Sequence, residues 1–122
     1  MDFLIKDARP IWQQLSEQLR RRIVTGTYPP GSRFPTVREL AAEAGVNPNT
    51  MQRAITQLED DALVITNRTA GRTVSSDTAV LEAARRSMAE ERVEEFYRDM
   101  ESLGYARREA AELLGSKGEH YE

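Results

Sequence analysis

The chain has 122 residues, a formal net charge of −3, one histidine and no cysteine. This length suits one domain with an appendage, and the lack of cysteine excludes a disulfide framework and a Cys/His zinc site. No apolar run approaches the ~20 residues of a membrane span, and no signal-peptide pattern opens the chain. We therefore expect a cytoplasmic protein without a metal or another cofactor.

The negative charge is concentrated in the C-terminal part of the chain. Residues 1–76 carry ten Lys and Arg against eight Asp and Glu, a balance of +2, whereas residues 77–122 carry seven against twelve, a balance of −5. A nucleic-acid surface in the first part would depend on individually placed arginines, because no dense basic patch is present.

The N-terminal region predicts an apolar arm or short strand at residues 3–5, followed by a helix. Pro10 suits the first turn of that helix, and apolar residues recur at helical spacing as far as Gly26. We expect Trp12 to belong to the core, and only some arginines of the basic run 20–22 can face a partner. A rigid Pro- and Gly-containing turn follows this helix.

Two helix starts with a tight turn between them lie in residues 34–53. Thr36 and Glu39 have the spacing of a capping box, which predicts a helix of about ten residues ending at Gly45. Asn47 then has the character of a second N-cap, with Pro48 at the first helical position. This arrangement predicts a helix-turn-helix unit.

The second helix of this unit, about residues 47–60, has one apolar and one polar face. Met51, Ile55 and Leu58 recur on the side expected to face the core. The polar side carries groups that hydrogen-bond base edges and phosphates: Asn47, Asn49, Thr50, Gln52 and Arg53. Taken alone, this pattern is explained equally well by a solvated helix of a small α-helical domain, so the flanking sequence decides.

A β-hairpin is predicted directly after the helix-turn-helix. An extended segment begins at Ala62, with strands at 63–66 and 72–75 around a turn at 67–71. A hairpin in this position is typical of the wing of a winged helix. Two arginines flank its tip and are expected near the minor groove or phosphates: Arg68 and Arg72.

The remaining residues predict two helices. One runs over 79–103 and ends at Gly104, and the other runs over 105–114 and closes at Gly115, with the last seven residues frayed. The long helix carries an apolar stripe that we expect to pair with a second copy: Leu81, Ala84, Met88, Val93, Phe96, Tyr97, Met100 and Leu103. The alternative is that this stripe packs back on the winged helix.

Three segments carry a resemblance to a known family. They are P-I-W-Q-Q-L at 10–15, P-G-S-R-F-P-T-V-R-E-L-A at 30–41 and G-V-N-P-N-T-M-Q-R-A at 45–54. Together they resemble the GntR family of bacterial transcription regulators, and the short C-terminal part resembles its YtrA-like subfamily. The resemblance implies a mainly α fold with a small β-hairpin: a winged helix-turn-helix at 1–76 and a short two-helix dimerisation and possible effector region at 77–122.

The family motifs also imply which residues contact DNA. The resemblance implies a homodimeric repressor that reads a palindromic operator, often beside transporter genes. The second helix is expected in the major groove, and the wing, about 63–75, at the minor groove or phosphates. The resemblance implies contacts from Arg38, Asn47, Asn49, Thr50, Gln52, Arg53 and Gly71. The full set of expected DNA-binding residues adds Thr36, Pro48, Arg68 and Arg72. Two motifs differ from the family: the wing lacks the usual R-x-G-x-G-T-F pattern, and E-x-x-G-L is E-D-D-A-L at 59–63, which alters a turn.

Catalysis is not expected. The carboxylates cluster at 90–91 and 94–95 of a long helix, where solvation and pairing with arginines explain them. No nucleophile–base motif, phosphate loop or metal-ligand spacing is found. The alternative to a DNA-binding regulator is a winged-helix protein-interaction module without specific DNA readout. A small-molecule effector would have room only at the dimer seam or beside the helical tail.

Overall fold

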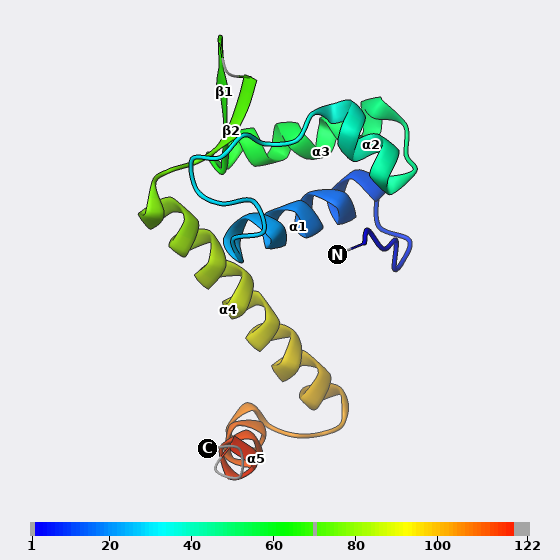
Figure 1. The fold of residues 1–122 in the computed structure, drawn as a ribbon. Coiled ribbons are helices and arrows are strands. Elements are labelled where there is room, and N and C mark those ends of the chain that lie inside the picture. The colour runs from blue at the N-terminus through cyan, green and yellow to red at the C-terminus, as the bar shows by residue number, and fades with distance from the viewer. Residues whose placement is uncertain (1, 70, 119–122) are drawn as a thin grey trace. The chain divides into compact units, whose positions relative to one another are not determined.

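The computed structural model describes residues 2–69 and 71–118. Within these ranges the elements follow in the order α1 (Ile11–Val24), α2 (Val37–Ala44), α3 (Pro48–Asp60), β1 (Val64–Asn67), β2 (Gly71–Val74), α4 (Thr78–Ser102) and α5 (Arg107–Gly118), as Figure 1 shows. The predicted mainly helical class with one small hairpin is confirmed. None of the helices in the described ranges is long and apolar enough to cross a membrane.

The chain forms two compact units that divide within α4. The first unit ends at Arg85 and the second begins at Arg86. The first unit therefore includes the start of α4, beyond residue 76 where the sequence suggested a boundary. Leu81 explains the difference, because its side chain is buried in the core of the first unit.

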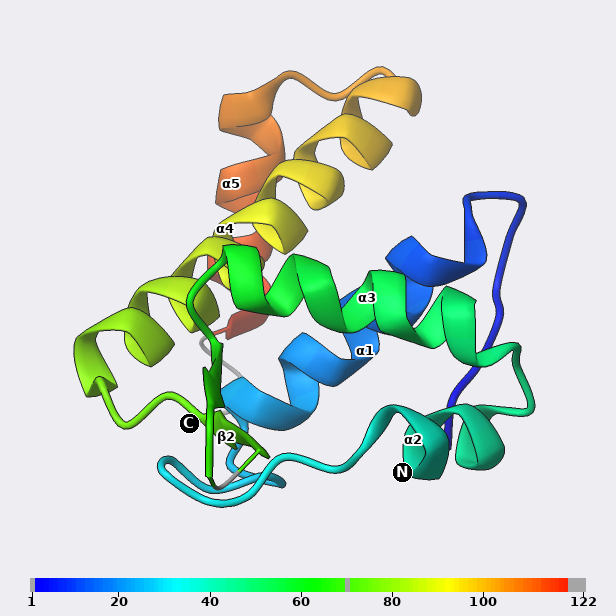
Figure 2. The same ribbon diagram turned by 90° about the horizontal axis from the view of Figure 1, so that it is seen from above.

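The core of the first unit lies between α1, α2, α3 and the hairpin. Helices α1 and α3 run side by side in Figures 1 and 2. Their apolar faces are fully buried, and the core-facing residues predicted for α3 are confirmed: Leu15, Leu19 and Ile23 from α1, and Met51, Ile55 and Leu58 from α3. Each such side chain stabilises the fold by about 1.5–3 kcal/mol relative to an exposed one.

The first helix of the helix-turn-helix begins and ends at the predicted residues. The Thr36 hydroxyl oxygen accepts the Glu39 backbone N–H at 3.1 Å, and Gly45 ends α2 with φ +68°. Between these caps α2 has eight residues, against a predicted length of about ten. A capping box has two hydrogen bonds, and among the described residues only the one from the Glu39 N–H to the Thr36 hydroxyl forms. The Glu39 carboxylate lies 3.8 Å from the Arg33 guanidinium instead.

The start of α3 is also confirmed. The Asn47 side-chain oxygen accepts the Asn49 backbone N–H at 2.7 Å, and Pro48 is the first helical residue. Val46, in the turn before this cap, packs half-buried against the core. These contacts set the direction in which α3 leaves the turn.

The wing is a two-stranded sheet that a third segment extends. β1 and β2 pair antiparallel from Val64 opposite Val74 to Asn67 opposite Gly71. The segment before α2 adds backbone hydrogen bonds to β2: the Val74 N–H donates to the Ser32 oxygen at 2.8 Å, and the Phe34 N–H donates to the Arg72 oxygen at 2.8 Å. The sequence predicted the hairpin but not this third segment, which ties the wing to the helices.

Ala62 was predicted to begin an extended segment, and the structure corrects this. Its φ is +61°, the only positive value at a described residue other than glycine. The Ala62 N–H donates to the Glu59 oxygen at 3.0 Å and the Leu63 N–H donates to the Leu58 oxygen at 3.0 Å. These two bonds form the left-handed turn that closes many helices, where glycine is the usual residue.

Ala62→Gly should therefore stabilise the protein by about 0.5–1 kcal/mol. A left-handed conformation costs a residue with a Cβ about 1–2 kcal/mol, and the larger entropy of unfolded glycine offsets part of that gain. The matched control is Ala83→Gly in the second turn of α4, which should destabilise by about 1 kcal/mol because that residue is right-handed helical. Urea unfolding measures both, and a lower midpoint for Ala62→Gly would contradict the assignment.

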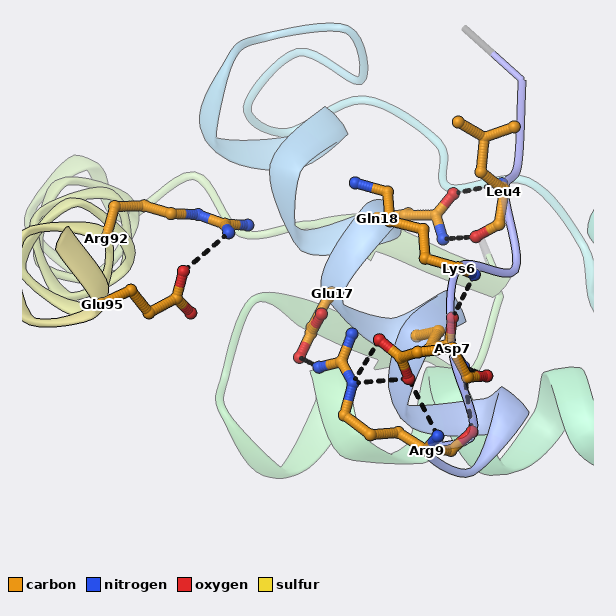
Figure 3. Close-up of polar contacts among 9 residues, drawn as sticks. Leu4, Lys6, Asp7, Arg9, Glu17, Gln18, Arg92 and Glu95 are labelled. Atoms are coloured by element: carbon orange, nitrogen blue, oxygen red, sulfur yellow. Dashed lines mark hydrogen bonds and ion pairs between the residues drawn. The ribbon is translucent and has the colours of Figure 1, made fainter. Parts of the chain in front are cut away.

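The N-terminal residues form an arm along α1 (Figure 3). The Leu4 N–H donates to the Gln18 side-chain oxygen at 2.8 Å, and the Gln18 amide donates back to the Leu4 oxygen at 2.6 Å. One turn earlier on α1, Gln14 accepts the Lys6 N–H at 2.8 Å and donates to the Arg9 oxygen at 2.9 Å. Two side-chain amides thus hold the arm by its backbone, and of the two predicted alternatives the arm is confirmed.

The second unit contains the rest of α4 and α5. Tyr105 belongs to the turn that ends α4, because its N–H donates to the Met100 oxygen at 3.0 Å and Gly104 has φ +91°. α5 consequently starts at Arg107, later than predicted. The predicted end at Gly115 is wrong, since a glycine weakens a helix without ending it. Of the residues predicted to be frayed, 116–118 lie in α5 and 119–122 lie outside the described residues.

Candidate nucleic-acid interface

α3 presents a polar face opposite the core. The side chains along it are amides, hydroxyls and a guanidinium. Asn47, Pro48, Asn49, Arg53 and Thr56 are exposed, and Thr50 and Gln52 are half-buried. These groups match the donors and acceptors of base edges and phosphates. Sequence reasoning missed Thr56, although its spacing four residues after Gln52 places it on the same face.

The side of α3 toward the wing is joined to the hairpin by a charged cluster. The Glu59 carboxylate accepts the Thr66 hydroxyl from β1 and lies 3.5 Å from the Arg72 Nε of β2. Arg72 also donates to the Gln52 side-chain oxygen at 3.5 Å. One carboxylate of α3 therefore contacts both wing strands, and Arg72 is directed toward α3. Glu59 was not among the predicted functional residues.

The opposite side of α3 faces α1. There the Arg53 guanidinium carbon lies 4.4 Å from the centroid of the Trp12 ring, which is the geometry of a cation–π contact. Trp12 is half-buried and packs against the core, as the sequence predicted. Its ring in addition contacts a predicted DNA-contacting residue, Arg53.

A shallow groove separates the start of α2 from the wing. Its volume is about 450 Å³, and two arginines and the α2 cap residue are among those that line it: Arg33, Arg72 and Thr36. Arg38, in the first turn of α2, is exposed. The groove therefore combines cationic side chains with the positive end of a helix, a combination that favours phosphate. Arg33 was not predicted to take part.

The wing tip exposes one arginine and one glycine. Arg68 lies at the tip and is exposed. Gly71 has φ +71°, and a Cβ added there would meet nothing within 4 Å. The glycine is thus required by its backbone conformation, and the open space beside it permits close approach of a partner. The neighbouring Ala70 of the predicted turn lies outside the described residues.

The predicted dimerisation stripe is divided between the two units. Leu81 and Ala84 pack against the core of the first unit. In the second unit Met88, Phe96, Tyr97 and Met100 are half-buried, whereas Val93 is 49% and Leu103 71% exposed. α5 adds two further exposed leucines at positions 113 and 114. The second unit thus exposes large apolar side chains on both helices.

Ionic contacts order the second unit around Tyr97. The Arg107 guanidinium pairs with Glu94 at 2.8 Å and lies 4.3 Å from the Tyr97 ring centroid. The hydrogen bond from Arg107 lowers the pKa of Glu94 below its ordinary value. Phe96 contacts Tyr97 edge to face at 5.5 Å. The Arg107 contacts join α5 to α4, the two helices that carry the exposed apolar residues.

A helix-turn-helix that exposes a polar row on its second helix, followed by a β-hairpin, defines a winged helix-turn-helix DNA-binding protein. The family model of bacterial regulatory proteins of the gntR family matches residues 12–74, and the chain belongs to this family. It is therefore a DNA-binding transcriptional regulator and not an enzyme. The family predicted from the sequence is confirmed.

Similarity to known members covers most of the chain. A GntR family transcriptional regulator from Listeria monocytogenes has 32% identity and a TM-score of 0.81 over 92% of this chain and 98% of its own. The transcriptional repressor YtrA of Bacillus subtilis is 29% identical over 81% of this chain and 77% of its own. The AraR DNA-binding domain in complex with operator ORX1 has 26% identity and a TM-score of 0.54 over 59% of this chain and 93% of its own.

Proposed function

We propose that the chain is a repressor that binds a palindromic operator as a homodimer. The observation that carries the proposal is that one chain contains both an exposed recognition helix, α3, and a second unit whose helices expose large apolar side chains. Two recognition helices related by a two-fold axis reach half-sites about one helical turn, ~34 Å, apart. A dimer bound at such a site excludes RNA polymerase from the DNA that it covers. The protein would act in this way in the cytoplasm. The similarity to the repressor YtrA supports this direction of regulation.

In this proposal α3 reads the bases, and the start of α2 binds the DNA backbone. Asn49, Gln52 and Thr56 lie on the outer face of the helix and read base edges in the major groove. Asn47 contributes only its amide nitrogen, since its side-chain oxygen caps α3. Thr36 and Arg38 at the start of α2 bind backbone phosphates, and the remaining predicted contacts at the start of α3 are Pro48 and Thr50.

The wing takes part through its tip. Arg68 is exposed there, and Gly71 lets the backbone approach the minor groove. Arg72 orients the wing against α3 through Glu59 and Gln52, and it also lines the groove beside Thr36. The wing arginines therefore have different roles: Arg68 is exposed at the tip, and Arg72 is bound to α3.

Selection of bound duplexes from a random library at near-physiological salt tests the proposal. Enrichment of a palindrome with half-sites about ten base pairs apart is the expected result. A single half-site would overturn the homodimeric part of the proposal. If no sequence enriched, specific readout would be wrong, and the alternative of a winged-helix protein-interaction module would replace it.

Arg38→Ala and Asn49→Ala should affect DNA binding in different ways. Arg38→Ala removes one phosphate contact from each protomer, so affinity for every duplex should fall and the slope of log K against log salt should decrease by about 1.8 per dimer. Asn49→Ala should relax the preference at one base pair of each half-site by about 1–3 kcal/mol, leaving unrelated duplexes little affected.

Fluorescence anisotropy over a salt series measures both effects. The matched control is Arg86→Ala, which removes an exposed arginine from α4, where it pairs with Glu90 at 3.5 Å. This control should leave the salt slope unchanged. An unchanged slope for Arg38→Ala, or an unchanged base preference for Asn49→Ala, would show that the residue in question is misassigned.

A further inference from the structure

The contact between Trp12 and Arg53 joins two helices at the edge of the proposed DNA surface. Trp12 lies in the first turn of α1, and Arg53 lies in the second turn of α3. The guanidinium carbon stands 4.4 Å from the ring centroid. The ring is held against the core, whereas Arg53 is exposed. A fixed aromatic face thus supports a cation that is open to solvent.

A cation–π contact of this kind leaves donors of the guanidinium available. Arginine carries five N–H donors in a planar fork, and a ring beside the cation does not engage all of them. An incoming phosphate can accept two of these N–H groups without displacing the ring. Because the ring already limits the positions of the long side chain, less conformational entropy is lost on binding.

The position of Arg53 around α3 favours the DNA backbone over the bases. Successive residues of an α-helix are turned by about 100°. Gln52 lies on the wing side, where it bonds Arg72, and Arg53 is turned from there toward α1. A helix in the major groove presents its centre to base edges and its flanks to the phosphates that border the groove. Arg53 stands on such a flank.

We propose that Trp12 is a positioning residue for DNA binding, and that it holds Arg53 ready to bind a backbone phosphate. The inference rests on the function proposed above and assigns Arg53 to affinity rather than to sequence readout. Trp12 itself touches no base and acts through the guanidinium. The α1 helix is in this way part of the DNA-binding machinery as well as of the core.

A double-mutant cycle on the full chain tests the inference. The variants are Arg53→Ala, Trp12→Leu, their combination and Trp12→Phe, which retains an aromatic face. The probes are the duplex enriched by selection and an unrelated mixed-sequence duplex of equal length, each titrated over a salt series by fluorescence anisotropy. Thermal unfolding of each variant separates loss of fold from loss of contact.

Arg53→Ala should weaken binding to both probes by the same factor, about 10-fold, and reduce the salt slope by about 1.8 per dimer. Trp12→Leu should weaken binding about threefold when Arg53 is present and have no effect when Arg53 is absent. Trp12→Phe should restore most of the loss. The matched control is Arg21→Ala, which removes an exposed arginine near the other end of α1 and should leave the slope unchanged.

Three results would overturn the inference. The first is an equal effect of Trp12→Leu with and without Arg53, which would mean that the tryptophan acts only on the fold. The second is an altered base preference for Arg53→Ala, which would make Arg53 a base reader. The third is failure of the unmodified chain to bind either probe, which alone among the three would also overturn the proposed function.

Discussion

Phe34→Ala should lower the free energy of unfolding by about 3–5 kcal/mol, the range typical of a deleted buried aromatic ring. The Phe34 side chain is 1% exposed, and the Tyr28 ring packs against it edge to face at 5.3 Å. A small domain has a total stability of about 5–15 kcal/mol, so this loss is a large fraction of it. The measurement is urea unfolding followed by circular dichroism.

The backbone of Phe34 has a separate role, which Phe34→Ala leaves intact. Its backbone N–H bonds the Arg72 oxygen, so the same residue fills the core and anchors the wing to the segment before α2. Two further variants isolate the cavity. Phe34→Leu keeps much of the volume and should cost less, and Ile65→Ala on the exposed side of β1 should change stability only slightly. Stability within 1 kcal/mol of the unmodified chain for Phe34→Ala would contradict this account.

Helix starts in this chain were predictable because their signals are local. The Thr36 and Asn47 caps each need a side-chain oxygen within three residues of the N–H that it accepts. The apolar spacing that predicts the core face of α3 also depends only on neighbours along the helix. Local chemistry therefore determines these elements before any tertiary contact forms.

Helix ends were harder to predict where the usual residue is absent or misleading. Ala62 adopts the left-handed turn that glycine normally occupies, so no glycine marked the turn. Gly115 has the opposite effect, since a glycine stands there and α5 continues past it. Tyr105 belongs to the turn after α4 because of a hydrogen bond to Met100, which the sequence pattern does not reveal. Backbone bonding decides these cases, and composition does not.

The contacts that arrange the proposed interface depend on the tertiary fold. Glu59 meets Arg72 only after the hairpin folds onto α3, and Trp12 meets Arg53 only when α1 packs beside α3. The sequence indicated the residue types that face DNA, because they stand in a polar row of α3. It did not indicate which of them are held in place by partners, since those partners are distant in the chain.

The exposed apolar residues of the second unit lead to a prediction about the oligomeric state. Val93→Glu combined with Leu103→Glu should convert the proposed homodimer into monomers. Both side chains are exposed in the single chain, so the substitutions leave its fold intact, but each would bury an unpaired charge in an apolar interface. Sedimentation velocity at micromolar concentration measures the change. A monomeric unmodified chain, or a dimeric double variant, would contradict the proposed interface.

Loss of the dimer should in turn weaken operator binding by about 10²–10⁴-fold, because the second half-site is no longer bound at the high effective concentration that a partner provides. Binding to a duplex with a single half-site should change far less. The matched control is Ala89→Glu, which adds a charge at an exposed position of the same helix outside the stripe and should keep the dimer and its affinity. If the double variant is monomeric and retains full affinity for the palindrome, each protomer reads its half-site independently. The α4–α5 unit would then be unnecessary for operator recognition.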